Sequence, residues 1–237
     1  MRATTSRQAG PMVALLAVLL AVTAAAALYF EMPEPHIDNT NKVAITLEPG
    51  EALRVTFVGD SLDYGLYATE ADLGFHPLMV EAWRAGGPVT DTPLNSLGGT
   101  ANRALGNDDI PVDQHLVVVE LGTNDFSRQS HRDFRRDYDE LLSRLRLASP
   151  KGALLCIGPW RPADAAQRFE TIVEDLCEAR GGVFRSVSDL SENAQMKGPP
   201  GIPTFGGPSD SFHPNDRGHR AIADRMLAAV SVDRLGA

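Results

Sequence analysis

The sequence has few cysteines, few aromatic residues and no cluster of basic residues. Its only cysteines are Cys156 and Cys177, which excludes a disulfide-rich scaffold, and a metal site would need further ligands. The net charge is −9 and no Lys/Arg cluster offsets it, so a nucleic-acid partner is not expected. Internal repeats and low-complexity tracts are also lacking, which argues against a fibrous or disordered protein.

One long apolar run lies near the N-terminus. Residues 12–30 carry no charge, two arginines precede them and three acidic residues follow. This asymmetry predicts export of everything downstream. The run is nearly long enough to span a bilayer, and the alanines at 24–27 offer signal-peptidase-type cleavage sites. Residues 1–30 are therefore interpreted as a transmembrane anchor or a cleaved signal peptide. Any membrane contact would come from this segment, because the acidic remainder does not attract anionic lipid.

Export would permit a disulfide between the two cysteines. Cys156 lies in a predicted strand, and Cys177 lies on the apolar face of the helix predicted to follow it. The two could meet, so a disulfide and two buried free thiols both remain open.

The rest of the chain is expected to form one α/β domain at residues 51–237, preceded by a Pro/Gly-containing linker at 31–50. Short apolar, β-branched runs alternate with segments in which apolar residues recur at helical spacing. The alternation predicts a parallel sheet with helices on both faces, and sites in such sheets form at the carboxyl ends of the strands. The predicted strands are 53–58, 93–97 (the weakest), 117–121, 153–157 and 183–187, and the main predicted helices are 133–147, 164–180 and 215–230.

A serine follows the first predicted strand, in the run Gly59-Asp60-Ser61-Leu62. A serine at a strand-to-helix turn has its hydroxyl at the rim of the sheet, which suits nucleophilic attack. Taken alone, Asp60 and Ser61 could equally be a turn and a helix cap. The hydrolase elbow G-x-S-x-G is not matched, because position 63 is Asp.

Two further strand ends carry groups that could stabilise an oxyanion. Gly122-Thr123-Asn124-Asp125 follows the predicted strand 117–121 and supplies a side-chain amide. Gly98-Gly99 follows the weakest strand, and glycine lets backbone N–H groups approach a substrate closely. Either glycine could be the donor.

Near the C-terminus, Asp210 and His213 are three residues apart before the last predicted helix. On one turn they would project to the same side, so that Asp210 could orient His213 as a general base. The other histidines have no comparable acidic partner in the sequence and are interpreted as structural: His36, His76, His115, His131 and His219.

Together these blocks resemble the SGNH/GDSL family of serine hydrolases over nearly all of residues 51–230. The resemblance implies a three-layer flavodoxin-like fold with strand order 2-1-3-4-5. It also implies that Ser61 attacks an ester carbonyl while His213 takes its proton and Asp210 holds His213. The Ser61 N–H, the Gly98 N–H and the Asn124 amide would form the oxyanion hole, and neither cofactor nor metal is expected.

Residues beside these groups are expected to support the site or line the substrate pocket: Asp60, Leu62, Asp125 and Trp160. The segments 63–78, 160–165 and 196–208 are expected to wall the pocket, and Trp160, Ile202 and Phe205 could contact an acyl chain. The expected substrate is an envelope or extracellular ester.

Three alternative functions would use the same residues differently. An O-acyltransferase would use the same Ser61 acyl-enzyme but pass the acyl group to another hydroxyl. The run 59–63 also fits the G-D-x-x-D pattern of metal-dependent phosphoesterases, yet their D-x-H and G-N-H partners are missing. A silent binding module would require a broken triad, whereas all the expected residues are present.

Overall fold

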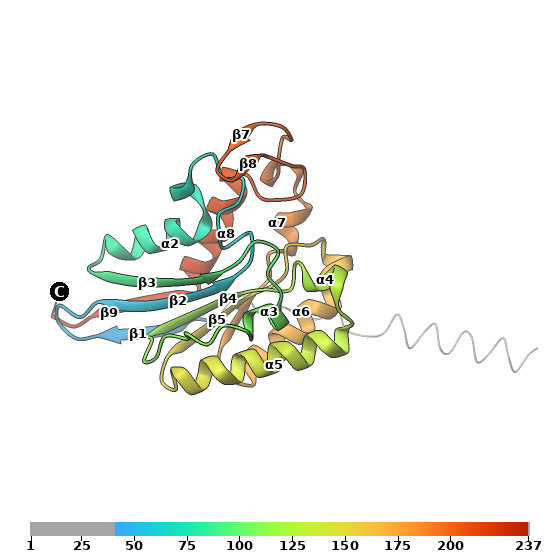
Figure 1. Ribbon diagram of the computed structural model, residues 1–237. Helices are drawn as coiled ribbons and strands as arrows, with labels where there is room; N and C mark the ends of the chain where they lie inside the picture. The colour runs from blue at the N-terminus through green and yellow to red at the C-terminus, as the bar shows by residue number, and fades with distance from the viewer. Residues whose placement is uncertain (1–40, 237) are drawn as a thin grey trace, which may run out of the picture. The chain divides into compact units, whose positions relative to one another are not determined.

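The computed structural model describes residues 41–236, so the expected anchor or signal peptide at 1–30 lies outside the described residues. A five-stranded parallel sheet forms the centre of the described part, in the order β3-β2-β4-β5-β6 (Figure 1). Counted along the chain within this sheet, the order is 2-1-3-4-5, which confirms the expected fold. Its strands are β2 (Leu53–Gly59), β3 (Val89–Asn95), β4 (Leu116–Glu120), β5 (Ala153–Ile157) and β6 (Val183–Arg185).

Helices cover both faces of this sheet, as Figure 1 shows. On one face α2 (Phe75–Arg84) and α8 (Asp216–Ala228) pack against each other and share a core with β2. On the other face α3 (Ala101–Ala104), α5 (His131–Ala148) and α6 (Ala163–Glu178) pack together. The shorter helices are η1 (Ala71–Leu73), α4 (Asp125–Arg128), α7 (Ser188–Glu192) and η2 (Ala194–Met196). No helix within residues 41–236 has the length and apolarity needed to cross a bilayer.

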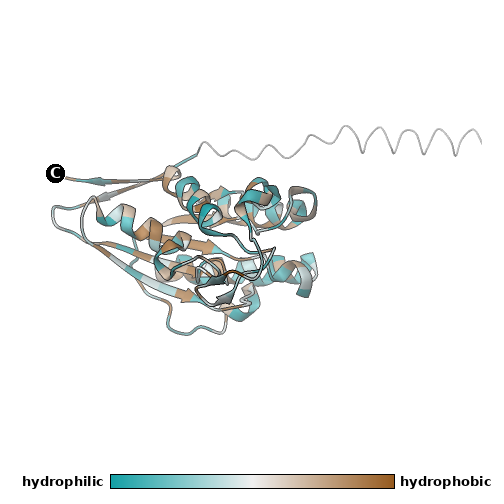
Figure 2. Cartoon of the chain, turned by 90° about the horizontal axis from the view of Figure 1, so that it is seen from above, coloured by the Kyte–Doolittle hydropathy of each residue, from teal (hydrophilic) through white to brown (hydrophobic). Residues whose placement is uncertain are grey.

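The inner strands are hydrophobic because both of their faces are covered. All five residues of β4 are buried, and its side chains alternate between the two cores: Leu116 and Val118 face one, Val117 and Val119 the other. Near-continuous apolar strands are typical of parallel sheets buried on both sides. Figure 2 shows hydrophobic colour in the inner part of the sheet, and both hydrophobic and hydrophilic positions on the helices.

The expected linker at 31–50 contains a strand. β1 (Val43–Leu47) pairs in parallel with β9 (Val230–Arg234) at the other end of the described chain. Val43, Ile45 and Leu47 are buried while the residues between them are exposed. The domain therefore begins before residue 51, because this strand completes the core beside α8.

Two other features bear on the sequence expectations. β3 begins four residues earlier than the weak strand expected at 93–97, and it is the half-exposed edge of the sheet, where Pro93 is tolerated. Cys156 and Cys177 form a disulfide that joins β5 to α6, and both are fully buried. The structure thus decides the question that the sequence left open.

Candidate active site

The candidate catalytic groups lie where neighbouring strands end. Gly59, the last residue of β2, pairs with Glu120, the last residue of β4, and with Asn95, the last residue of β3. The loops that follow these strands therefore start side by side. This is why Ser61 and Asn124, 63 positions apart in the sequence, share one rim of the sheet.

Ser61, His213 and Asp210 form a continuous relay. The Ser61 Oγ lies 3.1 Å from His213 Nε2, and His213 Nδ1 lies 2.7 Å from Asp210 Oδ2. The other carboxylate oxygen of Asp210 accepts the backbone N–H groups of Phe212 and His213 at 2.8 and 2.7 Å. Burial alone would raise the pKa of Asp210, but these bonds outweigh it and hold the pKa below its ordinary value. Asp210 is thus held as a carboxylate facing the imidazole.

The turn that carries His213 is fixed by the start of α8. Asn215 caps this helix by accepting the Gly218 N–H at 3.0 Å. Its amide nitrogen also donates to the carbonyl oxygens of Gln195, Lys197 and Gly198. One side chain therefore ties the turn to the loop that passes over it.

Asp60 links the serine to Asn124. Its Oδ1 accepts the Leu62 N–H at 3.0 Å and lies 3.4 Å from the Ser61 hydroxyl. Its Oδ2 accepts a hydrogen bond from the Asn124 amide at 2.7 Å. Asp60 is fully buried, so these bonds set the positions of both groups with little interference from solvent.

A second buried acid, Glu120, lies directly behind Asp60. Its Oε2 accepts the Asp60 backbone N–H at 3.3 Å. Burial raises the pKa of Asp60 to about 6 and, together with the charges of Asp60 and Asp63, raises the pKa of Glu120 well above its ordinary value. Two adjacent buried carboxylates are costly when both are charged, so Glu120 retains its proton while Asp60 ionises. Asp125 is also buried: it accepts the Ala101 N–H at 3.0 Å, and burial raises its pKa to about 6.

The two glycines after β3 differ in what their N–H groups do. The Gly99 N–H donates to the Ser96 carbonyl at 2.8 Å. Gly98 has a φ of 66°, and its carbonyl accepts a hydrogen bond from Arg128 at 2.7 Å. Within residues 41–236, no acceptor is bonded to the backbone N–H of Gly98 or of Ser61. These two donors are therefore available to a ligand, whereas that of Gly99 is occupied.

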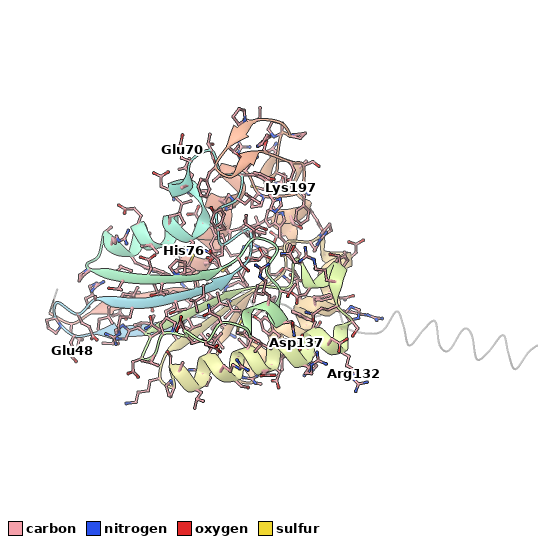
Figure 3. The ribbon with its side chains drawn as sticks, viewed as in Figure 1. Glu48, Glu70, His76, Arg132, Asp137 and Lys197 are labelled. Atoms are coloured by element: carbon pink, nitrogen blue, oxygen red, sulfur yellow. A yellow bond between two sulfur atoms is a disulfide. The ribbon has the colours of Figure 1, made fainter. Side chains whose placement is uncertain are left out.

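His76 belongs to a polar cluster that the sequence did not reveal. Its Nδ1 lies 3.2 Å from Asp63 and its Nε2 lies 3.4 Å from Asp91, while its ring stacks on Phe57. Asn95 also donates to Asp63 at 2.9 Å. The expectation that His76 lacks an acidic partner is wrong, because the acids come from other elements; Figure 3 shows His76 between α2 and the sheet. The cluster ties the turn after Ser61 to β3.

Two other histidines were also expected to be structural. His115 lies 3.1 Å from Glu51, so it too has an acidic partner. His219 is fully buried and accepts the Phe75 N–H at 3.3 Å, and burial lowers its pKa to about 4. A neutral, buried His219 fits the structural role expected of it.

Trp160 does not line a pocket. It is fully buried, its indole N–H donates to the Phe212 carbonyl at 2.7 Å, and its backbone N–H donates to Thr123 Oγ1 at 2.9 Å. The expectation of substrate contact is therefore corrected. Trp160 instead holds together the segments that carry Asn124 and His213, a role invisible without the distant partners.

A surface cavity of about 710 Å³ reaches Asn215, two residues after His213, although neither Ser61 nor His213 lines it. Tyr67, whose ring meets that of His213 edge-on at 5.1 Å, forms part of its wall. Much of the rest comes from the loop at 196–208, which includes the short strands β7 (Pro203–Thr204) and β8 (Gly207–Pro208). Ile202 and Lys197 line the cavity, and Lys197 is labelled in Figure 3. Within the described residues, no group of three or more His, Cys, Asp or Glu side chains is placed to hold a metal ion.

The family of the chain is established by a match between its sequence and a family model. The family model of the GDSL-like lipases/acylhydrolases matches residues 57–221 of the chain. The chain belongs to this family. As a GDSL-like hydrolase it is an enzyme that cleaves carboxylic esters, and the resemblance read from its four sequence blocks is confirmed.

Solved structures of two esterases and a phospholipase share the fold. The psychrotrophic esterase EstA from Pseudoalteromonas sp. superposes with a TM-score of 0.61 at 17% identity, over 75% of this chain and 96% of EstA. Phospholipase A1 from Streptomyces albidoflavus NA297 superposes with a TM-score of 0.57 at 14% identity, over 76% of this chain and 100% of the phospholipase. A family two carbohydrate esterase from Clostridium thermocellum superposes with a TM-score of 0.55 at 17% identity, over 76% of this chain and 63% of the esterase chain. At these identities the likeness establishes the fold alone. No curated protein sequence matched the chain.

Proposed function

We propose that this GDSL-like hydrolase is a serine esterase that works through an acyl-enzyme on Ser61. The observation that carries the proposal is the relay from the Ser61 hydroxyl through His213 to Asp210, with separations of 3.1 and 2.7 Å. Its order and spacing are those of a nucleophile, a general base and an orienting carboxylate.

In the first half-reaction, the Ser61 Oγ attacks the ester carbonyl and its proton passes to His213 Nε2. The negative charge that develops on the carbonyl oxygen is stabilised by the N–H groups of Ser61 and Gly98 and by the Asn124 amide. Collapse of the intermediate expels the alcohol, which takes the proton from His213. Water then attacks the acyl-serine with His213 again as the base, releasing the carboxylic acid and restoring the Ser61 hydroxyl.

Gly98 is the preferred backbone donor of the second block. The Gly99 N–H is already bonded to Ser96, so its use would first require breaking that turn. The positive φ of Gly98 also suits a residue without Cβ.

We place the enzyme outside the cytoplasm, acting on envelope or extracellular esters. The N-terminal apolar run with its charge asymmetry and the buried disulfide support this placement. Carbohydrate esterases with this fold have been solved with cellohexaose and with mannopentaose, so an acylated glycan is one candidate substrate.

The test is hydrolysis of 4-nitrophenyl esters, from acetyl to palmitoyl, by the full-length chain and by Ser61→Ala, both in EDTA. Turnover that disappears in the variant would support the serine mechanism, and its dependence on chain length would measure the acyl pocket. Turnover that survives Ser61→Ala would refute it.

Labelling with a phosphonate separates the remaining possibilities; the Pseudoalteromonas esterase was solved inhibited by monoethylphosphonate. Ser61 that is labelled but hydrolyses no ester would point to acyl transfer. Ser61 that is neither labelled nor active would point to a binding module.

A further inference from the structure

An arginine that the triad and oxyanion hole do not use lies beside both. Arg161 follows β5, and its guanidinium carbon lies over the rings of Phe126 and Phe212, 4.9 and 4.6 Å from their centroids. Phe212 is the neighbour of His213 in the chain. The Arg161 Nε and Nη2 both donate to the carbonyl of Thr123, the neighbour of Asn124, at 3.4 and 3.1 Å. The guanidinium therefore contacts the chain neighbour of the proposed base and the chain neighbour of the proposed oxyanion donor.

The guanidinium of Arg161 is held rigidly. Two aromatic rings contact it, and its Nε–Nη2 edge is hydrogen-bonded to the Thr123 carbonyl. The preceding residue, Trp160, is locked in place by its own bonds to Thr123 and Phe212. A side chain fixed in this way loses little further conformational entropy when it binds a ligand.

The remaining edge of this guanidinium, with Nη1, has no partner among the described residues. No Asp or Glu oxygen in the described part of the chain lies within ion-pair distance of it, whereas Arg225 and Arg180 each contact an aspartate. The charge of Asp60 acts on Arg161 only from a distance, and partial burial lowers the pKa of the guanidinium. A half-buried cation without a contacting anion is costly, and an anionic ligand would offset that cost.

We propose that Arg161 forms an anion subsite, so that the preferred substrates are esters carrying a carboxylate or phosphate group close to the scissile bond. This inference rests on the proposed esterase function and specifies its substrate class. The free guanidinium edge has the fork geometry that binds such groups through two parallel hydrogen bonds. Thr123 and Phe212, which hold the guanidinium, are the chain neighbours of Asn124 and His213, so an anion bound there would also orient the ester.

The experiment compares esters that differ only in charge. On the alcohol side, 4-acetoxybenzoate is paired with neutral 4-acetoxybenzamide; on the acyl side, 4-nitrophenyl hemisuccinate is paired with 4-nitrophenyl succinamate. In one of the two pairs we expect the anionic ester to have a higher kcat/KM than its neutral partner, mainly because its KM is lower. In Arg161→Met the anion-to-neutral ratio should fall about tenfold for that pair, and Arg161→Lys should restore part of it. Added salt should reduce the wild-type ratio.

Arg168→Met is the matched control, because it removes one positive charge from an exposed position on α6. Its ratios should equal those of the wild type. The anion subsite is refuted if Arg161→Met lowers kcat/KM equally for both esters in each pair. It is also refuted if the wild type and Arg161→Met have the same anion-to-neutral ratios of kcat/KM. Ser61→Ala, assayed on the neutral esters, tests the esterase function separately: activity that survives it would refute that function whatever the ratios.

Discussion

At the scale of single residues, Asp60 connects the groups that must act together. Its carboxylate lies 3.4 Å from the Ser61 hydroxyl, while the competing acceptor, His213 Nε2, lies at 3.1 Å. Its second oxygen holds the Asn124 amide. The proposed nucleophile and the proposed oxyanion donor are thus positioned by one buried group, which limits how independently either can move.

Asp210→Asn tests the acid–base relay. The new side chain retains an oxygen that can accept the Phe212 and His213 N–H groups, so the turn should survive. The negative charge that stabilises a protonated His213 is lost, and we expect kcat to fall by roughly 10³–10⁴-fold. Ester hydrolysis measured alongside the melting temperature is the check. Near wild-type kcat in a folded variant would remove Asp210 from the mechanism.

Asn124→Ala tests the oxyanion contact. The amide should act mainly on the charge that develops in the transition state, so kcat should fall about 10²–10³-fold with little change in KM. Steady-state kinetics with a 4-nitrophenyl ester separates the two parameters. A change confined to KM would make Asn124 a substrate-binding residue instead.

The sequence indicated these residues because each follows a recognisable strand and belongs to a short block. It did not indicate the partners of His76, since Asp63 and Asp91 come from different elements and meet it only in the folded protein. The burial of Trp160 was missed for the same reason: its partners Thr123 and Phe212 are 37 and 52 residues away in the sequence.

At the scale of secondary-structure elements, the carboxyl end of β4 places a protonatable acid in the core. Glu120 is the last residue of this strand and is almost completely buried. In the folded protein its pKa lies well above the ordinary value of 4.5. As the pH rises above the ordinary pKa of 4.5, the unfolded chain releases this proton while the native protein keeps it. Glu120 therefore lowers the free energy of unfolding progressively as the pH increases.

Glu120→Gln should remove that pH dependence. Glutamine resembles the protonated acid and can still accept the Asp60 N–H. We expect a melting temperature above that of the wild type at pH 8, by about 2–4 °C for each kcal/mol gained, and no difference near pH 4. Glu140→Gln, at an exposed position on α5, is the control. If Glu120→Gln raises the melting temperature by the same amount at pH 8 and at pH 4, Glu120 is not protonated in the native protein.

At the scale of the whole molecule, the alternation of strands and helices predicted the layered architecture, and the family resemblance supplied the strand order. The helices expected at 133–147, 164–180 and 215–230 match α5, α6 and α8 to within two residues at each end. β1 was missed because Pro and Gly residues surround it and its partner, β9, lies at the far end of the chain. Its signal was present in the sequence, since Val43, Ile45 and Leu47 alternate with small or polar residues.

The pairing of β1 with β9 predicts where the folding domain begins. A fragment of residues 41–237 should be much more stable than one of residues 51–237. The shorter fragment lacks three buried side chains worth ~1.5–3 kcal/mol each, which is a large share of the ~5–15 kcal/mol that stabilises a typical domain. Urea unfolding of the two fragments measures the difference.

A substitution in the full-length chain tests the same contact if the shorter fragment does not fold. Ile45→Ala should cost ~2–4 kcal/mol, because Ile45 is only 6% exposed and packs into the core. Thr46→Ala, at the exposed neighbouring position on the same strand, should cost far less. Equal unfolding midpoints for Ile45→Ala and Thr46→Ala would show that the packing of β1 contributes little to the stability of the domain.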